Sequence, residues 1–259
     1  MPHIDPLYSL AGVLVGLLVG LTGVGGGSLM TPLLVLAFGF HPATAVGTDL
    51  LYASATKTAG TVVHGWRGSV DWKVVRRLAA GSVPATIATL AWLGFTHGMP
   101  GASAKLISLI LGVTLILTAI AILFRGRIVA ALGPRFADVG EGRIGWATVV
   151  LGAVLGALVS LTSVGAGALG MTALLVLYPR APVARLVGSD IAHAVPLTLI
   201  AGLGHWALGT VDFGLLIALL LGSIPGIVVG SLIATRVSDK VLVPILATVL
   251  AIVGFKLLS

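Results

Sequence analysis

Two aspartates are the acidic residues that the sequence places deep inside apolar segments. Asp49 and Asp190 follow Pro42 and Pro182 by seven or eight residues. If each proline marks the start of a helix, the carboxyl group lies about 10 to 12 Å along it, well inside the hydrocarbon of a membrane. An ionised carboxylate is costly there, but a carboxyl group that takes up and releases a proton suits a transport cycle. The alternatives are that each aspartate caps a neighbouring helix or pairs with a buried cation.

The aspartates occupy equivalent positions in a repeat with a period of about 141 residues. The clearest match is glycine-rich, because LVGLTGVGGGSL at 18–29 returns as LVSLTSVGAGAL at 158–169. A period of this length is typical of a duplicated membrane half and is too long for a solenoid repeat.

Each glycine-rich segment interrupts an apolar stretch. In the first half, residues 7–23 precede it and residues 28–38 follow it. The second piece covers only about half of the hydrocarbon at ~1.5 Å per residue. We therefore expect a helical hairpin with a glycine tip buried at membrane depth, and a second hairpin at 145–178.

The hairpin tips are candidate anion sites. A short helix that begins at a tip directs unpaired amides and the positive end of its dipole toward it, and glycines let an anion approach the backbone. The alternative is close helix packing, which we expect of the GxxxG spacings Gly12–Gly16 and Gly152–Gly156. The candidate anion-binding residues are Thr22, Gly25, Gly26, Gly27, Ser28, Thr31, Thr162, Gly165, Ala166 and Gly167.

Two more ionisable residues accompany the aspartates. His193 lies three residues after Asp190 on the same helical face, where it either tunes the proton affinity of the carboxyl group or is simply packed and hydrogen-bonded. Lys57 lies two turns beyond Asp49, and Thr198 stands at its equivalent position. Lys57 is either a central cation for an anionic substrate or a side chain that extends to the cytoplasmic surface. Asp49, Asp190, His193 and Lys57 form the candidate proton-coupling group.

The composition identifies lipid as the solvent. Hydrophobic residues make up 58% of the chain and charged residues 9%, which is too few charges for a soluble surface. The stretches long enough to approach a membrane span are 78–95, 104–124, 144–162, 186–204, 214–235 and 241–258. The basic residues fall in short loops, which excludes nucleic acid as the partner, and the absence of cysteine excludes thiolate metal sites. We expect no cofactor, no metal and no cleavable signal peptide.

The distribution of basic residues predicts the orientation. Loops at 64–77, 125–143, 180–185 and 236–240 carry 12 of the 15 Lys and Arg residues, whereas the loop at 205–213, equivalent to the first, has none. If the basic loops are cytoplasmic, the two halves have opposite orientations. We predict an all-α integral membrane protein with two inverted-topology repeats, at 1–124 and 144–259, each a glycine-tipped hairpin plus about three spanning helices. Residues 125–143 are the expected cytoplasmic linker loop.

Three segments carry a family resemblance. AGVLVGLLVGLTGVGGGSLMTPLL at 11–34, HPATAVGTDL at 41–50 and HGWRGSVDW at 64–72 resemble the sulfite exporter TauE/SafE family, also called the toluene sulfonate uptake permease family. The resemblance implies a permease for small sulfur-containing or organic anions such as sulfite or sulfonates. The second tip departs from the family pattern, because Ala166 replaces the central glycine and Ala173 stands where the first half has Pro32.

The leading hypothesis is a secondary transporter in the bacterial plasma (inner) membrane, coupled to protons or alternatively to sodium. Its expected partners are a small anion and the lipid bilayer, and a homo-oligomer is compatible with the sequence. A passive anion channel is the first alternative. An intramembrane enzyme is the second, and the sequence contains neither HExxH nor the serine and histidine motifs of a membrane protease.

Overall fold

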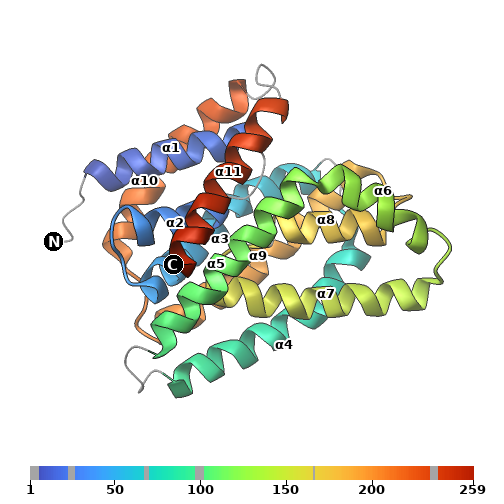
Figure 1. Cartoon of the computed structure of the whole chain (residues 1–259), viewed down its shortest axis with the longest axis horizontal. Coiled ribbons are helices and arrows are strands. Elements are labelled where there is room, and N and C mark those ends of the chain that lie inside the picture. Colours follow the sequence, from blue (N-terminus) through green and yellow to red (C-terminus); the bar gives the residue numbers. More distant parts are fainter. Residues whose placement is uncertain (1–5, 23–26, 67–69, 97–101, 166, 234–238) are drawn as a thin grey trace.

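The computed structural model describes residues 6–22, 27–66, 70–96, 102–165, 167–233 and 239–259, and these residues are helical apart from short connections (Figure 1). The helices of the first half are α1 (Pro6–Thr22), α2 (Gly27–Leu36), α3 (Pro42–Trp66), α4 (Trp72–Thr96) and α5 (Ala102–Leu123). Those of the second half are α7 (Glu141–Thr162), α8 (Ala168–Leu177), α9 (Val183–Ala207), α10 (Phe213–Ile233) and α11 (Asp239–Leu258). The prediction of an all-α fold is confirmed.

Within the described residues, five helices are long and apolar enough to cross a membrane. They are Trp72–Thr96, Lys105–Leu123, Glu141–Thr162, Val183–Ala207 and Phe213–Gly230. The protein is therefore a multi-pass membrane protein, as its composition predicted.

Two features of the fold were not predicted. α3 is as long as its equivalent α9, at 25 residues, although its sequence was not among the expected apolar stretches. The segment expected to be a linker loop contains a helix, α6 (Arg125–Phe136), which packs on α8 and α5. Gly133 of α6 is buried, and Pro179 lies beside it.

The first helix of each half packs along the fourth helix of the other half. Figure 1 shows α1 beside α10 and, on the opposite side of the molecule, α4 beside α7. A Cβ atom on Gly12 would lie 2.4 Å from the carbonyl oxygen of Leu219, and one on Gly152 would lie 2.1 Å from that of Leu78. No side chain fits at such distances, so the predicted close-packing role of the GxxxG glycines is confirmed.

Equivalent helices of the two halves also pack against each other, and they run antiparallel. On α3 and α9, Gly47 lies against His205 whereas Leu51 lies against Gly202. α5 and α11 pack in the same sense, through Gly112 and Gly254. Each pairing therefore recurs when the halves are exchanged, because α1 on α10 corresponds to α7 on α4, whereas α3 on α9 and α5 on α11 correspond to themselves.

Candidate functional site

The two glycine-rich segments lead to helix starts that share one apolar cluster. Leu29, in the first turn of α2, packs in this cluster with Val164 and Ala168, which flank the start of α8. Buried residues of α5 and α11 complete it. α2 and α8 are ten residues each, about 15 Å, so both begin deep in the molecule.

The start of α8 carries no side-chain cap. Ser163 and Gly165 both have positive φ angles, of 58° and 115°, and the chain reverses there between α7 and α8. The N-cap residue Gly167 makes no side-chain hydrogen bond, and the amides of Gly170 and Met171 bond to the carbonyls of Gly165 and Gly167. The first amides of a helix have no partner within the helix, so this helix start can provide N–H groups to an anion.

Asp49 lies between the two hairpins. Its side chain is completely buried, and its Oδ2 accepts a hydrogen bond of 2.5 Å from the Thr31 hydroxyl on α2. The Ser163 hydroxyl, at the end of α7, faces the same carboxyl group. Neither Ser163 Oγ nor Asp49 Oδ1 has a hydrogen-bond partner within the described residues. The first-half carboxyl therefore contacts its own short helix and the tip region of the other half.

Asp190 occupies the corresponding place beside α8. It is 5% exposed, and its Oδ1 would lie 2.9 Å from a Cβ atom on Gly170. Unlike Asp49 Oδ2, its Oδ1 receives no hydrogen bond from the described part of the chain. Thr172, the equivalent of Thr31, donates to the carbonyl of Ala168 instead. The two carboxyl groups thus have equivalent positions and different hydrogen bonding.

A ring side chain lies three residues after each aspartate and faces a serine of the other half. His193 Nε2 is 2.8 Å from the Ser82 hydroxyl on α4. Tyr52 stands at the equivalent position, and Ser223 on α10 faces its hydroxyl. Tyr52 Oη and His193 Nδ1 are buried without a hydrogen-bond partner in the described residues. Unpaired polar atoms are rare in folded proteins, so their occurrence at equivalent positions of α3 and α9 makes this a candidate functional region.

The prediction from sequence did not include four residues of this region, namely Tyr52, Ser82, Ser163 and Ser223. A signal was present, because the repeat puts Tyr52 at the position of His193 and Ser82 at that of Ser223.

Lys57 is half-buried and lies close enough to both aspartates for electrostatic attraction. Arg125, at the start of α6, adds a second attraction to Asp190. The structure therefore brings together all four members of the candidate proton-coupling group, and it adds Arg125.

The candidate anion-binding residues divide into two groups. Thr31, Thr162, Gly165 and Gly167 lie on or beside the helix starts described above. The Thr162 hydroxyl donates a hydrogen bond to the Leu158 carbonyl and accepts one from the Val164 amide, so it stabilises the turn after α7. Thr22 ends α1, and Gly27 and Ser28 begin α2, but their side chains are outside the described part, as are Gly25, Gly26 and Ala166 entirely.

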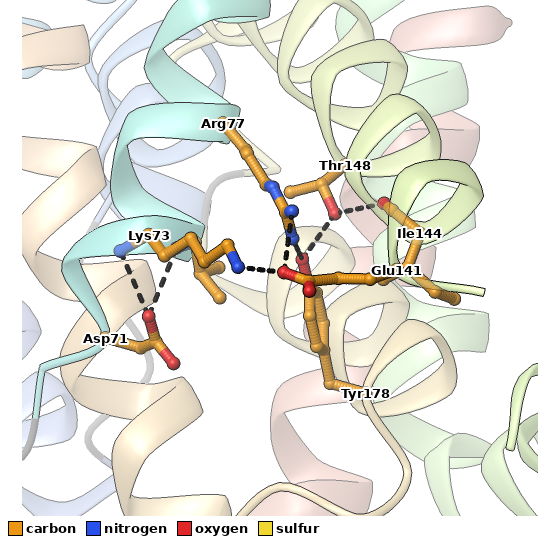
Figure 2. Close-up of polar contacts among 8 residues, drawn as sticks. Asp71, Lys73, Arg77, Glu141, Ile144, Thr148 and Tyr178 are labelled. Carbon is orange, nitrogen blue, oxygen red and sulfur yellow. Dashed lines mark hydrogen bonds and ion pairs between the residues drawn. The ribbon is translucent and has the colours of Figure 1, made fainter. Parts of the chain in front are cut away.

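Figure 2 shows a second polar network, which joins α4, α7 and the end of α8. Glu141 pairs with Lys73 and Arg77, and the Tyr178 hydroxyl is 3.5 Å from Arg77 and 2.7 Å from the Thr148 hydroxyl. Glu141 is largely exposed, so these ion pairs contribute little stability. The network instead shows that the basic loops at 64–77 and 125–143 meet on one side of the molecule.

Membrane-spanning helices in two similar halves, with buried carboxyl groups beside two short helices, are typical of membrane transporters. The sulfite exporter TauE/SafE family model matches residues 8–257, and the chain belongs to this family.

Its relatives are described as membrane transporters. The chain is 41% identical to the probable membrane transporter protein YjnA of Bacillus subtilis, over 83% of this chain and 84% of the relative. A probable membrane transporter protein of Xylella fastidiosa is 31% identical, over 83% of this chain and 78% of the relative. YdhB of Bacillus subtilis, also a probable membrane transporter protein, is 28% identical over 84% and 85%. No solved structure matches the chain with significance.

Proposed function

We propose that this membrane transporter is a secondary carrier for a small oxyanion, of the sulfur-containing or organic class to which sulfite and sulfonates belong, and that it is coupled to protons. The observation that carries the proposal is the presence of two helix starts in one cluster, that of α8 without a side-chain cap, with a buried aspartate beside each short helix. Helix starts provide amides and positive partial charge for an anion, and buried carboxyl groups provide sites for a coupling proton.

The anion is proposed to bind between the tips formed by residues 22–28 and 162–167, with Thr31 beside the site, where its hydroxyl donates to Asp49. The second tip has alanine at position 166, so its backbone is less open to an anion than the first. We therefore assign the closer anion contact to the first tip.

The expected result in sealed vesicles is counterflow. Purified protein in vesicles preloaded with an unlabelled anion is expected to accumulate the labelled anion transiently, because a carrier exchanges one bound ion for another. Sulfite, thiosulfate, methanesulfonate and a small carboxylate form the test panel, with protein-free vesicles as the control. Passive equilibration without overshoot would identify a channel, and no flux of any panel member would contradict the proposed substrate class.

We propose that the halves have inverted topology, with the boundaries 1–124 and 144–259 and the basic loops in the cytoplasm. Support comes from the antiparallel packing of α5 on α11 and of α3 on α9, because equivalent spanning helices that run antiparallel cross the membrane in opposite directions. Further support comes from the ion pairs Lys73–Glu141 and Arg180–Asp138, which join three of the basic loops.

Cysteine labelling tests this orientation. Trp72 and Phe213 begin α4 and α10 at equivalent places, and both are exposed, at 59% and 46%. The chain has no cysteine, so Trp72→Cys and Phe213→Cys each introduce a single thiol. A membrane-impermeant maleimide added to intact cells is expected to label the cysteine at position 213 but not the one at position 72. The cysteine at position 72 should be labelled once the cells are opened. Labelling of both from the same side would exclude inverted halves.

A further inference from the structure

Lys57 lies on α3, the helix that packs antiparallel on α9. Gly47 of α3 contacts His205 of α9, and Leu51, four residues further along α3, contacts Gly202, three residues earlier in α9. Continued for about one and a half turns, this antiparallel register brings Lys57 opposite residues 196–198. That range includes Thr198, its own counterpart in the repeat. Measured along this pair of helices, Lys57 therefore lies about midway between the two aspartates.

The charges around Lys57 are unequal in number. Asp49, on its own helix, and Asp190, across on α9, both attract its ammonium group. His193 of α9 is also within electrostatic range. The second half has Thr198 instead of a second lysine, so the repeat contains one central lysine for two equivalent carboxyl groups. Arg125 acts on Asp190 alone.

We propose that Lys57 is a cation shared by Asp49 and Asp190, and that a transported anion takes the ammonium group away from one of them, which then binds a proton. This inference rests on the proposed function as an anion carrier. An anion at the tips needs a positive partner in a region of low dielectric constant. A carboxylate that loses its cation in the same region is strongly disfavoured until it is protonated. The proton comes from the solvent, so each transported anion enters with one proton.

This arrangement accounts for the midpoint position of Lys57 better than extension to the surface does. A lysine that extends to the cytoplasm would need only the nearer carboxyl group, whereas a shared cation must reach both. It also couples the two halves, because Lys57 interacts with the aspartate of each. When Lys57 changes its partner, binding in one half changes the charge state of the aspartate in the other.

The first test needs no ligand. Lys57→Gln leaves two buried carboxyl groups without their cation, so the apparent Tm of the purified protein at neutral pH is expected to fall by about 5 °C or more. Asp49→Asn and Asp190→Asn, each combined with Lys57→Gln, should both recover part of the loss. Lys105→Gln, at an exposed lysine of α5, is the matched control and should leave Tm unchanged. An unchanged Tm for Lys57→Gln, or recovery with only one of the two aspartate variants, would overturn the sharing of Lys57.

The second test measures protons directly. Methanesulfonate and thiosulfate stay ionised at neutral pH, so a proton taken up when they bind must enter the protein. In weak buffer with a pH indicator, the wild-type protein and Lys57→Arg are expected to take up about one proton per bound anion. Lys57→Gln is expected to take up almost none. Anion binding by the wild type without proton uptake would overturn the competition for Lys57. Absence of any anion binding would contradict the proposed function instead, and the ligand-free test would still decide whether Lys57 is shared.

Discussion

Leucine in place of Gly26 is expected to lower the initial rate of anion counterflow by at least about a hundredfold, equivalent to ~2.7 kcal/mol. Gly26 is the central residue of the GVGGGS segment, directly before the start of α2. A branched side chain there would occupy the space through which an anion reaches the backbone amides. The measurement is counterflow in vesicles at matched protein content.

The control for this variant is Gly126→Leu. Gly126 lies on α6, and a Cβ atom added there meets nothing within 4 Å. Gly126→Leu therefore adds the same side chain at a position where the β carbon makes no contact, and this variant should transport like the wild type. Gly165 is unsuitable for this comparison, because its φ of 115° would make any side chain a source of backbone strain. An unchanged rate and half-saturating concentration for Gly26→Leu would assign the first tip to helix packing.

Much of the helix pattern could be predicted from local sequence. Pro42 begins α3 and Pro182 immediately precedes α9, because proline favours the first turn of a helix. The breaks before α2 and α8 followed from glycines that interrupt apolar runs. These features depend on residues close together in the chain, and the repeat provided a second reading of each.

The length of α3 and the formation of α6 could not be predicted in the same way. α3 carries Thr48, Asp49 and Ser54, which are buried against other helices and do not face lipid. A hydropathy pattern counts such residues as polar and so underestimates the span. α6 contains Gly126, Gly133 and Pro134, which favour a loop by propensity, yet it packs against α8 in the tertiary structure.

The partners of the candidate residues were also beyond the reach of a single sequence. The repeat identified Asp49 and Asp190 as equivalent, but it could not show that Ser163 of the second half faces Asp49 of the first. It likewise gave no sign that Ser82 of the first half bonds to His193 of the second. Such contacts arise where helices of one half pack on those of the other, α7 on α3 and α4 on α9, which depends on shape and not on local pattern.

Asparagine at Asp49 is expected to abolish accumulation driven by a pH gradient while leaving counterflow largely intact. The amide oxygen of asparagine still accepts the hydrogen bond that Thr31 donates, so the contact between α3 and α2 survives. The amide does not bind a proton in the physiological range, so a transport step that carries a proton on this side chain is lost. Exchange of one anion for another needs no net proton movement, so counterflow should persist in the variant that has lost gradient-driven accumulation.

Asp190→Asn is the companion variant, and at least one of the two is expected to lose proton-driven accumulation. Asp49 is the stronger candidate, because it is completely buried and contacts both a short helix of its own half and the tip region of the other. Thr31→Val serves as the control, since it removes the hydrogen bond but keeps the carboxyl group, and it should still respond to the gradient. The measurement is labelled-anion uptake into vesicles with an imposed pH difference, with and without a protonophore. If both asparagine variants concentrate the anion as the wild type does, neither aspartate carries the coupling proton, and the same vesicles with a sodium gradient would then decide whether sodium takes its place.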